Sequence, residues 1–319
     1  MKKLIIIFAT LMSISSVWAW APSKPIEVII GWNPGSGNEL IFRKLAEEVE
    51  KNTGAKFMII HKAGAGATIA TRHLTTRPAD GHTVSVVISK GIAVQDKINV
   101  PSQLTRGYSS DDFTYIMLPA VNQFAIIANI KDSINGPKDL INALNNQPLT
   151  FVAGGGSRLV YEVLKEHTAF KDVVHLNDNG PVQAINEIMG GHARLAIVPT
   201  LVAGTYHQAG SIKIVATTGK SRVIQEVATV SEVLSGFEVT TGWGIIAPKN
   251  LPKEMQEWYL REFGKALQSQ SVKTFYRNNL LEMPSTNLLT SAGYYSYVKT
   301  NEAQYANTVD RVAKEIHKK

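Results

Sequence analysis

The sequence contains no cysteine among its 319 residues, and charged residues make up only 18% of it. A chain without cysteine forms no disulfide bond, offers no thiolate to a metal ion and has no attachment point for a thioether-linked lipid. The formal net charge of +7 is spread along the chain rather than gathered in a Lys/Arg cluster interleaved with aromatic residues. This composition argues against nucleic-acid binding.

Long hydrophobic runs are also absent, except for one near the N-terminus. Lys2 and Lys3 precede the apolar run 4–12, and Val17-Trp18-Ala19 has the small-x-small pattern of a cleavage site. The run is too short to span a membrane. We therefore expect residues 1–19 to be a signal peptide cleaved after Ala19, which leaves an exported, periplasmic protein with a net charge of +5.

Catalytic and metal-binding motifs are missing as well. The sequence has no Gly-x-Ser-x-Gly elbow, no P-loop and no dinucleotide fingerprint, and its eight histidines have no metal-ligand spacing. We expect no catalytic residue, no metal and no cofactor. A hydrolase or isomerase that uses a cleft remains an alternative, but it would need a nucleophile or base with a partner, and the sequence does not display one.

The most informative stretch is 27–51, which predicts a buried strand, a glycine-rich turn and an amphipathic helix. Gly35 and Gly37 allow a sharp turn that a ligand could approach closely. Ser36 and Glu39 have the spacing of a capping box, which predicts that the helix begins there. The N–H groups of such a helix N-terminus can bind an anion, although many strand–glycine–helix turns bind nothing.

Similar units follow along the chain. The further expected strands are 56–61, 82–88, 115–118, 124–128, 149–153, 173–176, 195–198, 212–216 and 242–247. The further expected helices are 68–75, 159–165, 181–189, 252–268 and 291–317. This alternation predicts an α/β protein with parallel sheets. We expect two lobes joined by crossing strands, with 20–121 and 219–319 in lobe 1 and 122–218 in lobe 2.

A glycine turn opens each lobe, and two such turns facing one another could hold a carboxylate by neutral N–H donors. Other turns at the carboxyl ends of strands, with Ser89, Asn177 to Asn179 and Thr200, are natural cleft positions. Each of these residues could instead be a solvated turn residue. The candidate ligand-binding residues are Gly35, Ser36, Gly37, Asn38, Gly66 and Ser89 in lobe 1, and Gly156, Ser157, Arg158, Asn179 and Thr200 in lobe 2.

The ordered series of these motifs resembles the substrate-binding proteins of tripartite tricarboxylate transporters, also called the Bug family. The residues 34–39 are similar to the family's Pro-Gly-Gly turn, 62–67 to its Arg-Pro-Gly-Ala-Gly-Gly segment, and 79–83 to its Pro-Asp-Gly-Tyr-Thr turn. In the second half, 154–157 is similar to a Gly-x-Gly-Ser turn and 177–180 to a Pro-Tyr-x-Gly loop. The likeness extends over essentially all of the chain after the signal peptide.

The resemblance implies a type II periplasmic binding protein, in which two α/β lobes close by a hinge on a small carboxylate. It also implies delivery of the ligand to a two-subunit membrane permease, with a periplasmic sensor kinase as the alternative partner. Ser36, Glu39 and Asn177-Asp178 depart from the family pattern. These departures leave the implied fold intact and leave the identity of the ligand open.

Overall fold

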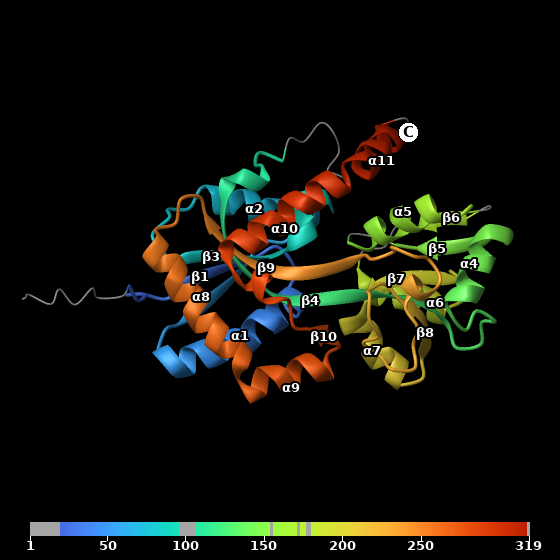
Figure 1. Cartoon of the computed structure of the whole chain (residues 1–319), viewed down its shortest axis with the longest axis horizontal. Coiled ribbons are helices and arrows are strands. Elements are labelled where there is room, and N and C mark those ends of the chain that lie inside the picture. The colour runs from blue at the N-terminus through green and yellow to red at the C-terminus, as the bar shows by residue number, and fades with distance from the viewer. Residues whose placement is uncertain (1–19, 96–105, 154–155, 171–172, 177–179, 318–319) are drawn as a thin grey trace, which may run out of the picture.

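The computed structural model describes residues 20–95, 106–153, 156–170, 173–176 and 180–317. They form two α/β lobes that lie side by side, with long strands running from one lobe into the other (Figure 1). The predicted two-lobed α/β architecture is therefore confirmed. In this described part of the chain, no helix has the length and apolar character needed to cross a membrane.

The strands form one continuous hydrogen-bonded path through both lobes. They are β1 (Ile26–Ile30), β2 (Phe57–His61), β3 (Thr83–Ile88), β4 (Phe113–Asn129), β5 (Leu149–Val152), β6 (Val173–Leu176), β7 (Leu195–Pro199), β8 (Ile212–Thr217), β9 (Thr240–Pro248) and β10 (Leu281–Glu282). Their order is β2-β1-β3-β9-β4-β7-β5-β6, and β8 and β10 also pair with β4. The β1–β2, β1–β3, β5–β6 and β5–β7 pairs are parallel, whereas β4 and β9 run antiparallel to their neighbours.

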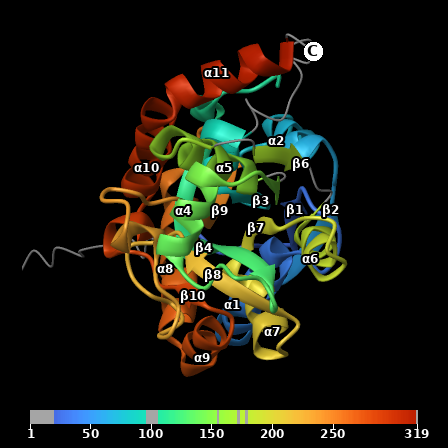
Figure 2. The same cartoon turned by 90° about the vertical axis from the view of Figure 1, so that its right-hand side faces the viewer.

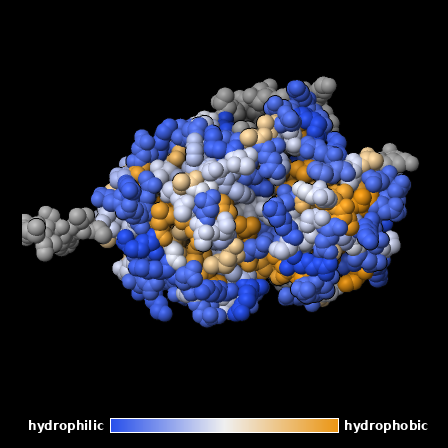
Figure 3. Space-filling view, viewed as in Figure 1, coloured by the Kyte–Doolittle hydropathy of each residue, from blue (hydrophilic) through white to orange (hydrophobic). Residues whose placement is uncertain are grey.

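Helices pack around the strands of both lobes. They are α1 (Gly37–Thr53), α2 (Thr68–Thr75), α4 (Pro137–Asn146), α5 (Ser157–His167), α6 (Pro181–Met189), α7 (Thr200–Gln208), α8 (Lys253–Gln268), α9 (Gln270–Asn278), α10 (Ser291–Gln304) and α11 (Ala306–His317). Short helical turns lie at η1 (Ala65–Ala67), η2 (Gly91–Gln95), η3 (Ser110–Asp112), η4 (Val230–Glu232) and η5 (Thr286–Leu289). On the face of Figure 1, the surface is mostly hydrophilic, with hydrophobic residues showing in the middle and on the right-hand lobe (Figure 3).

Two predicted elements differ from the structure. The expected short strands 115–118 and 124–128 are one strand, β4, which passes through Pro119 with register shifts against β9. Such irregularities accommodate a proline that cannot donate to the ladder. The expected helix 291–317 is two helices, α10 and α11, that meet at Tyr305. The helices α4, α7 and α9 were not predicted.

The crossing region is held by amide side chains on β4. The Gln123 side chain donates from Nε2 to the carbonyl of Ser221 (2.8 Å) and to Oε1 of Glu282 (2.9 Å). Its Oε1 accepts a hydrogen bond from the N–H of Gly219 at 3.1 Å. One fully buried amide thus ties β4 to the second crossing segment and to β10. The predicted lobe boundaries at 121/122 and 218/219 stay a prediction.

A lysine, Lys90, is buried just after β3. Lys90 is 5% exposed, and its Nζ lies 5.2 Å from the centre of the Tyr305 ring. Among the described residues it forms no ion pair. Burial lowers the pKa of Lys90 to about 8, and the negative charge of Glu238 opposes this without outweighing it.

We expect Lys90→Met to raise the free energy of unfolding by about 2 kcal/mol at pH 7, because a desolvated charge with only a cation–π contact is replaced by an apolar side chain. The folded pKa lies below the value of 10.5 for an unfolded lysine. Below pH 8 both states are protonated, so the full penalty is present, and it disappears as the pH rises toward 10.5.

Urea unfolding at several pH values measures this effect. The advantage of Lys90→Met over the unchanged protein should be constant up to pH 8 and shrink above it. An equal advantage at pH 7 and pH 10 would contradict a lowered pKa for Lys90.

Candidate functional site

The candidate site comprises the segments that follow the parallel strands of the two lobes. Figure 2 looks at lobe 2 end-on, with lobe 1 behind it. In both lobes a parallel strand is followed along the chain by a helix: β1 by α1, β2 by α2, β5 by α5 and β6 by α6. Segments at the carboxyl ends of the strands of an α/β sheet are the usual ligand positions.

The first glycine turn is closed by a carboxylate of the chain itself. Gly35 has a φ of +82°, which favours glycine, and its N–H donates to Oε2 of Glu39 at 2.8 Å. Ser36 occupies the N-cap position of α1, but its Oγ makes no capping bond and is buried without a partner in the described part of the chain. The predicted capping box is therefore wrong in its partners, because Glu39 folds back to Gly35 and not to Ser36.

The Glu39 carboxylate is held in its charged form. Its Oε1 accepts a hydrogen bond from Nε of Arg43 at 2.7 Å, and Nε2 of His61 lies 3.4 Å from Oε2. Burial alone would raise the pKa of Glu39, but the hydrogen bonds from Gly35 and Arg43 outweigh burial and hold that pKa below its usual range. A negative charge therefore stays at the first turn, where one backbone donor is already occupied.

Gly37 and Asn38 fix the start of α1 against both lobes. A Cβ on Gly37 would lie 3.0 Å from Cδ2 of Leu201 in α7, so the two lobes approach closely at this point. The Asn38 amide is 3% exposed; its Oδ1 accepts from Nε1 of Trp243 (2.9 Å) and its Nδ2 donates to the carbonyl of Val86 (3.3 Å). Its side chain therefore serves mainly to join α1 to β3 and β9.

Two buried polar groups near the turn after β2 lack a hydrogen-bond partner among the described residues. Ala65, Gly66 and Ala67 all have positive φ values, and α2 begins directly after them at Thr68. The Thr68 side chain is 3% exposed, yet its Oγ1 has no hydrogen-bond partner in the described structure. Nε1 of Trp32, which follows β1, is buried and unpartnered in the same way. Such groups are costly to bury unless water or a ligand pairs with them.

A small cavity of about 10 Å³ lies beside Trp32 and the residues just before Thr68, and its volume is close to the space that one water needs. Its lining residues are Trp32, Gly66, Ala67, Thr71, Val87, Ile88, Gly91 and Ile92. The cavity brings the ends of β1 and β3 together with the start of α2. Of the ligand-binding residues predicted in lobe 1, Gly66 lines this cavity.

Ser89 and Thr200 point away from this cavity. Ser89 is fully buried, and its Oγ donates to the carbonyl of Gly242 on β9 at 3.0 Å. Thr200 is also fully buried, and its Oγ1 lies 2.8 Å from Nδ2 and 3.0 Å from Oδ1 of Asn122 on β4. Both side chains are therefore occupied in the crossing region between the lobes.

Of the second glycine segment, residues 154 and 155 lie outside the described part of the chain; Gly156 is the N-cap residue of α5, and Ser157 is 5% exposed. The Arg158 guanidinium does not face solvent freely. Its Nη2 lies 2.5 Å from Oε1 of Glu162, and its Nη1 lies 2.5 Å from Nδ1 of His175. The predicted Asn179, together with Asn177 and Asp178, lies outside the described residues.

Two polar residues at the site were not singled out from the sequence, namely Trp32 and Thr68. Trp32 directly follows a predicted strand, and Thr68 directly follows the Gly-Ala-Gly-Ala loop. Their positions in the sequence therefore indicated that both lie at the edge of the sheet. No cluster of three or more His, Asp or Glu residues suited to a metal ion occurs among the described residues. The arrangement offers hydroxyl, indole and backbone N–H donors, which suits a neutral-donor site for an anion.

Comparison with known proteins places this geometry in a family. Protein BugT of Bordetella pertussis is 23% identical over 264 residues, which cover 79% of this chain and 78% of that protein. A protein encoded in the tcbD-tcbE intergenic region of a Pseudomonas species is 26% identical over 260 residues, which cover 79% of this chain and 76% of that protein.

Solved structures agree with the chain in fold. The periplasmic binding protein BugD superposes with a TM-score of 0.78 at 22% identity, covering 92% of this chain and 98% of BugD. Rpa4515 of Rhodopseudomonas palustris, solved with adipate, gives a TM-score of 0.80 at 20% identity, covering 92% of this chain and 98% of that one. MatC from the same species, solved with malate, gives a TM-score of 0.76 at 20% identity, covering 91% of this chain and 100% of MatC.

These likenesses confirm the predicted periplasmic-binding-protein fold. The model of the tripartite tricarboxylate transporter family receptor matches residues 41–301, which is well over half of the chain. The resemblance inferred from the glycine turns is thereby confirmed, and the chain belongs to the tripartite tricarboxylate transporter receptor family.

Proposed function

We propose that this protein captures a small carboxylate between its two lobes in the periplasm and presents it to a two-subunit tripartite tricarboxylate permease. Residues 1–19 act as the export signal in this proposal. Lobe closure around the ligand is the functional event, because a ligand that makes better contacts in the closed form shifts the equilibrium toward it.

The observation that carries the proposal is the set of unpartnered donors at the carboxyl ends of β1 and β2. Trp32 Nε1, Ser36 Oγ and Thr68 Oγ1 are buried and lack protein partners in the described part of the chain. The first intrahelical bond of α1 runs from Leu40 N–H to the Ser36 carbonyl, so the preceding N–H groups have no intrahelical acceptor. A carboxylate, directly or through a water, satisfies such donors.

Support for a carboxylate also comes from relatives, since Rpa4515 and MatC were solved with adipate and malate. We propose the predicted residues Gly35, Ser36, Gly37 and Gly66 as the lobe 1 contacts, with Trp32 and Thr68 added. Gly156, Ser157 and Asn179 remain the proposed lobe 2 contacts. Ser89, Asn38, Arg158 and Thr200 act in this proposal by holding the site together.

A charge at the first turn restricts which carboxylate fits. Glu39 stays ionised there, so the ligand anion binds more favourably to the Thr68 side of the cleft than to the Gly35 amide. A hydroxyl or amine on the ligand, turned toward Glu39, would complete the arrangement. A catalytic use of the same cleft and delivery to a sensor kinase are the alternatives, and no contact in the structure favours either.

The first test is a thermal-shift screen against mono-, di- and tricarboxylates, with phosphate and neutral amino acids as controls. Binding to the native state should raise the free energy of unfolding by about 2.7 kcal/mol at a hundredfold excess over Kd. Lobe closure is then read from spin labels at Lys51→Cys in α1 and Lys138→Cys in α4, which are exposed positions in a chain with no other cysteine.

A carboxylate that raises the melting temperature should also shift the distance between the two labels. A shift in melting temperature with an unchanged label distance would argue against closure. A response only to phosphate or to neutral amino acids would overturn the proposed ligand class.

Thr68→Val should weaken the affinity for the carboxylate found in this screen by about 1 kcal/mol, roughly fivefold, because a hydroxyl donor is lost at the site. The same change should leave the melting temperature of the ligand-free protein equal or higher, since it removes an unsatisfied buried hydroxyl. Calorimetry of binding and of unfolding measures the two effects. The matched control is Thr75→Val at the exposed end of the same helix, which should leave the affinity unchanged.

A further inference from the structure

A fully buried carboxylate lies one turn behind the start of α5. Glu162 has no exposed surface, and each of its oxygens faces an arginine. Oε1 lies 2.5 Å from Nη2 of Arg158, and Oε2 accepts a hydrogen bond from Nη1 of Arg311 at 2.7 Å. A buried charge of this kind is stable only while both partners stay in place.

The Arg158 side of this cluster reaches the residues on either side of the second glycine turn. Arg158 is the second residue of α5, and its Nη1 donates to Nδ1 of His175 on β6. His175 in turn donates from Nε2 to the carbonyl of Ala153, the last described residue before the turn, at 2.7 Å. Burial lowers the pKa of His175, and the neighbouring Arg158 adds to this, so the ring stays neutral and able to accept from Arg158.

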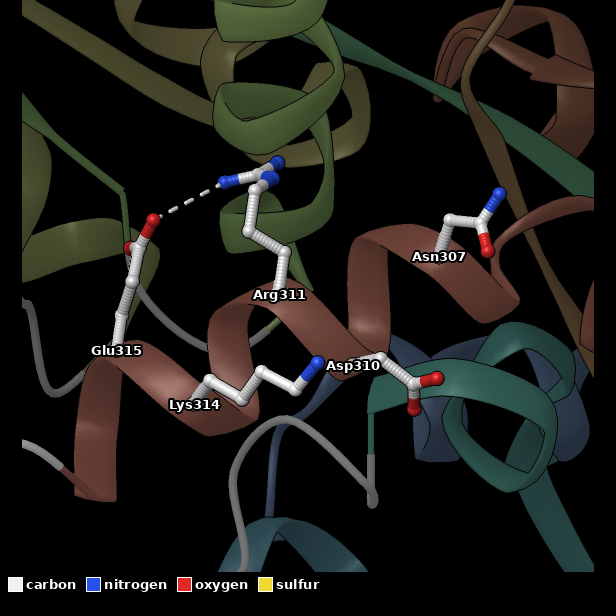
Figure 4. A pocket seen from close by; sticks show the side chains of 5 residues that line it. All are labelled: Asn307, Asp310, Arg311, Lys314 and Glu315. Atoms are coloured by element: carbon white, nitrogen blue, oxygen red, sulfur yellow. Dashed lines mark hydrogen bonds and ion pairs between the residues drawn. The ribbon is translucent and has the colours of Figure 1, made fainter.

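The other side of the cluster comes from the end of the chain. Arg311 lies on α11 and points toward α5, away from Lys314 on the same helix (Figure 4). Its Nη2 donates to Oε1 of Glu166 at 3.0 Å, and Thr308 Oγ1 donates to the same oxygen at 2.8 Å. The helix α11 is therefore tied to lobe 2 at two carboxylates of α5.

The helix before it belongs to the other lobe. The helix α10 packs on β4 and η2, and its Tyr294 lies so close to β9 that a Cβ on Gly244 would overlap the Tyr294 hydroxyl. The chain breaks from α10 into α11 at Tyr305 and then crosses to α5 (Figure 1). The C-terminal helix is thus a third connection between the lobes, besides the crossing strands and the segment at Gly219.

We propose that Arg311 is a positioning residue for ligand binding: through Glu162 and Arg158 it fixes the N-terminal end of α5 at Gly156 and Ser157, two of the proposed lobe 2 contacts. This inference rests on the proposed function. In the proposed lobe closure α5 moves relative to α10, and the α11 contacts hold Gly156 and Ser157 in one placement. A ligand that needs that placement binds more weakly when Arg311 is removed.

The experiment compares Arg311→Gln, Arg311→Lys and Lys314→Gln. Arg311 and Lys314 both line an open cavity of about 430 Å³ beside α11. Lys314 forms no ion pair among the described residues, so it is the matched control. Amide hydrogen exchange of the ligand-free proteins is followed for a peptide covering 150–160 and for one covering α4. Binding is measured with malate, adipate and the carboxylate that the thermal screen identifies.

Arg311→Gln should speed exchange in the 150–160 peptide at least about fivefold and weaken carboxylate affinity about tenfold, with α4 unchanged. Lys314→Gln should match the unchanged protein, and Arg311→Lys should restore most of both effects, because an ammonium still neutralises Glu162. Unchanged exchange at 150–160 in a folded Arg311→Gln protein would overturn the proposal. Faster exchange throughout lobe 2, or no rescue by lysine, would also overturn it in favour of a purely structural role.

The exchange measurement needs no ligand, so it separates this proposal from the proposed function. A failed carboxylate screen with the expected exchange pattern would leave the positioning role standing and refute the ligand class. A successful screen with equal affinities for Arg311→Gln and the unchanged protein would refute the positioning role alone.

Discussion

The molecule depends on one strand that is long enough to serve two sheets. The first part of β4 pairs with β9 in lobe 1, and its later part, from Phe124, pairs with β7 and β8 in lobe 2. Between these parts lie Asn122 and Gln123, whose amides hold the start of α7, the returning chain and β10. Because backbone pairing is continuous through this point, a rotation of one lobe against the other would have to bend or twist β4 and its neighbours.

The strand–turn–helix units were predictable because each follows from a local pattern of β-branched residues, glycine and helical periodicity. The continuity of β4 was not, since Pro119 signals a break and only pairing with β9 keeps the strand intact. The break at Tyr305 was also missed, because the apolar spacing continues across it. Local sequence signals cannot report such tertiary effects.

In the candidate site, too, the sequence predicted the positions of residues but not their tertiary contacts. Ser89, Thr200 and Asn38 are at strand ends or helix starts, as predicted, but their side chains bond inward to Gly242, Asn122 and Trp243. Sequence position predicts the edge of the sheet and not the direction of a side chain. Trp32 and Thr68 became visible only when burial and the absence of partners in the described structure could be combined. The sequence therefore predicts which turns could contact a ligand. The buried donors without partners among the described residues indicate which side chains at those turns are available to it.

The core of lobe 1 is assembled from the two ends of the chain. Phe42 of α1 packs against Phe263 of α8 with ring centres 5.7 Å apart, and Trp258, Tyr259 and Val272 share a buried cluster with Ile26 and Val28. The N-terminal strand and helix therefore have no complete core until α8 has been synthesised. Contacts of such long sequence separation form slowly. The apolar faces of β1 and α1 are therefore buried only after the C-terminal helices have joined them, which makes the completion of lobe 1 a late step in folding.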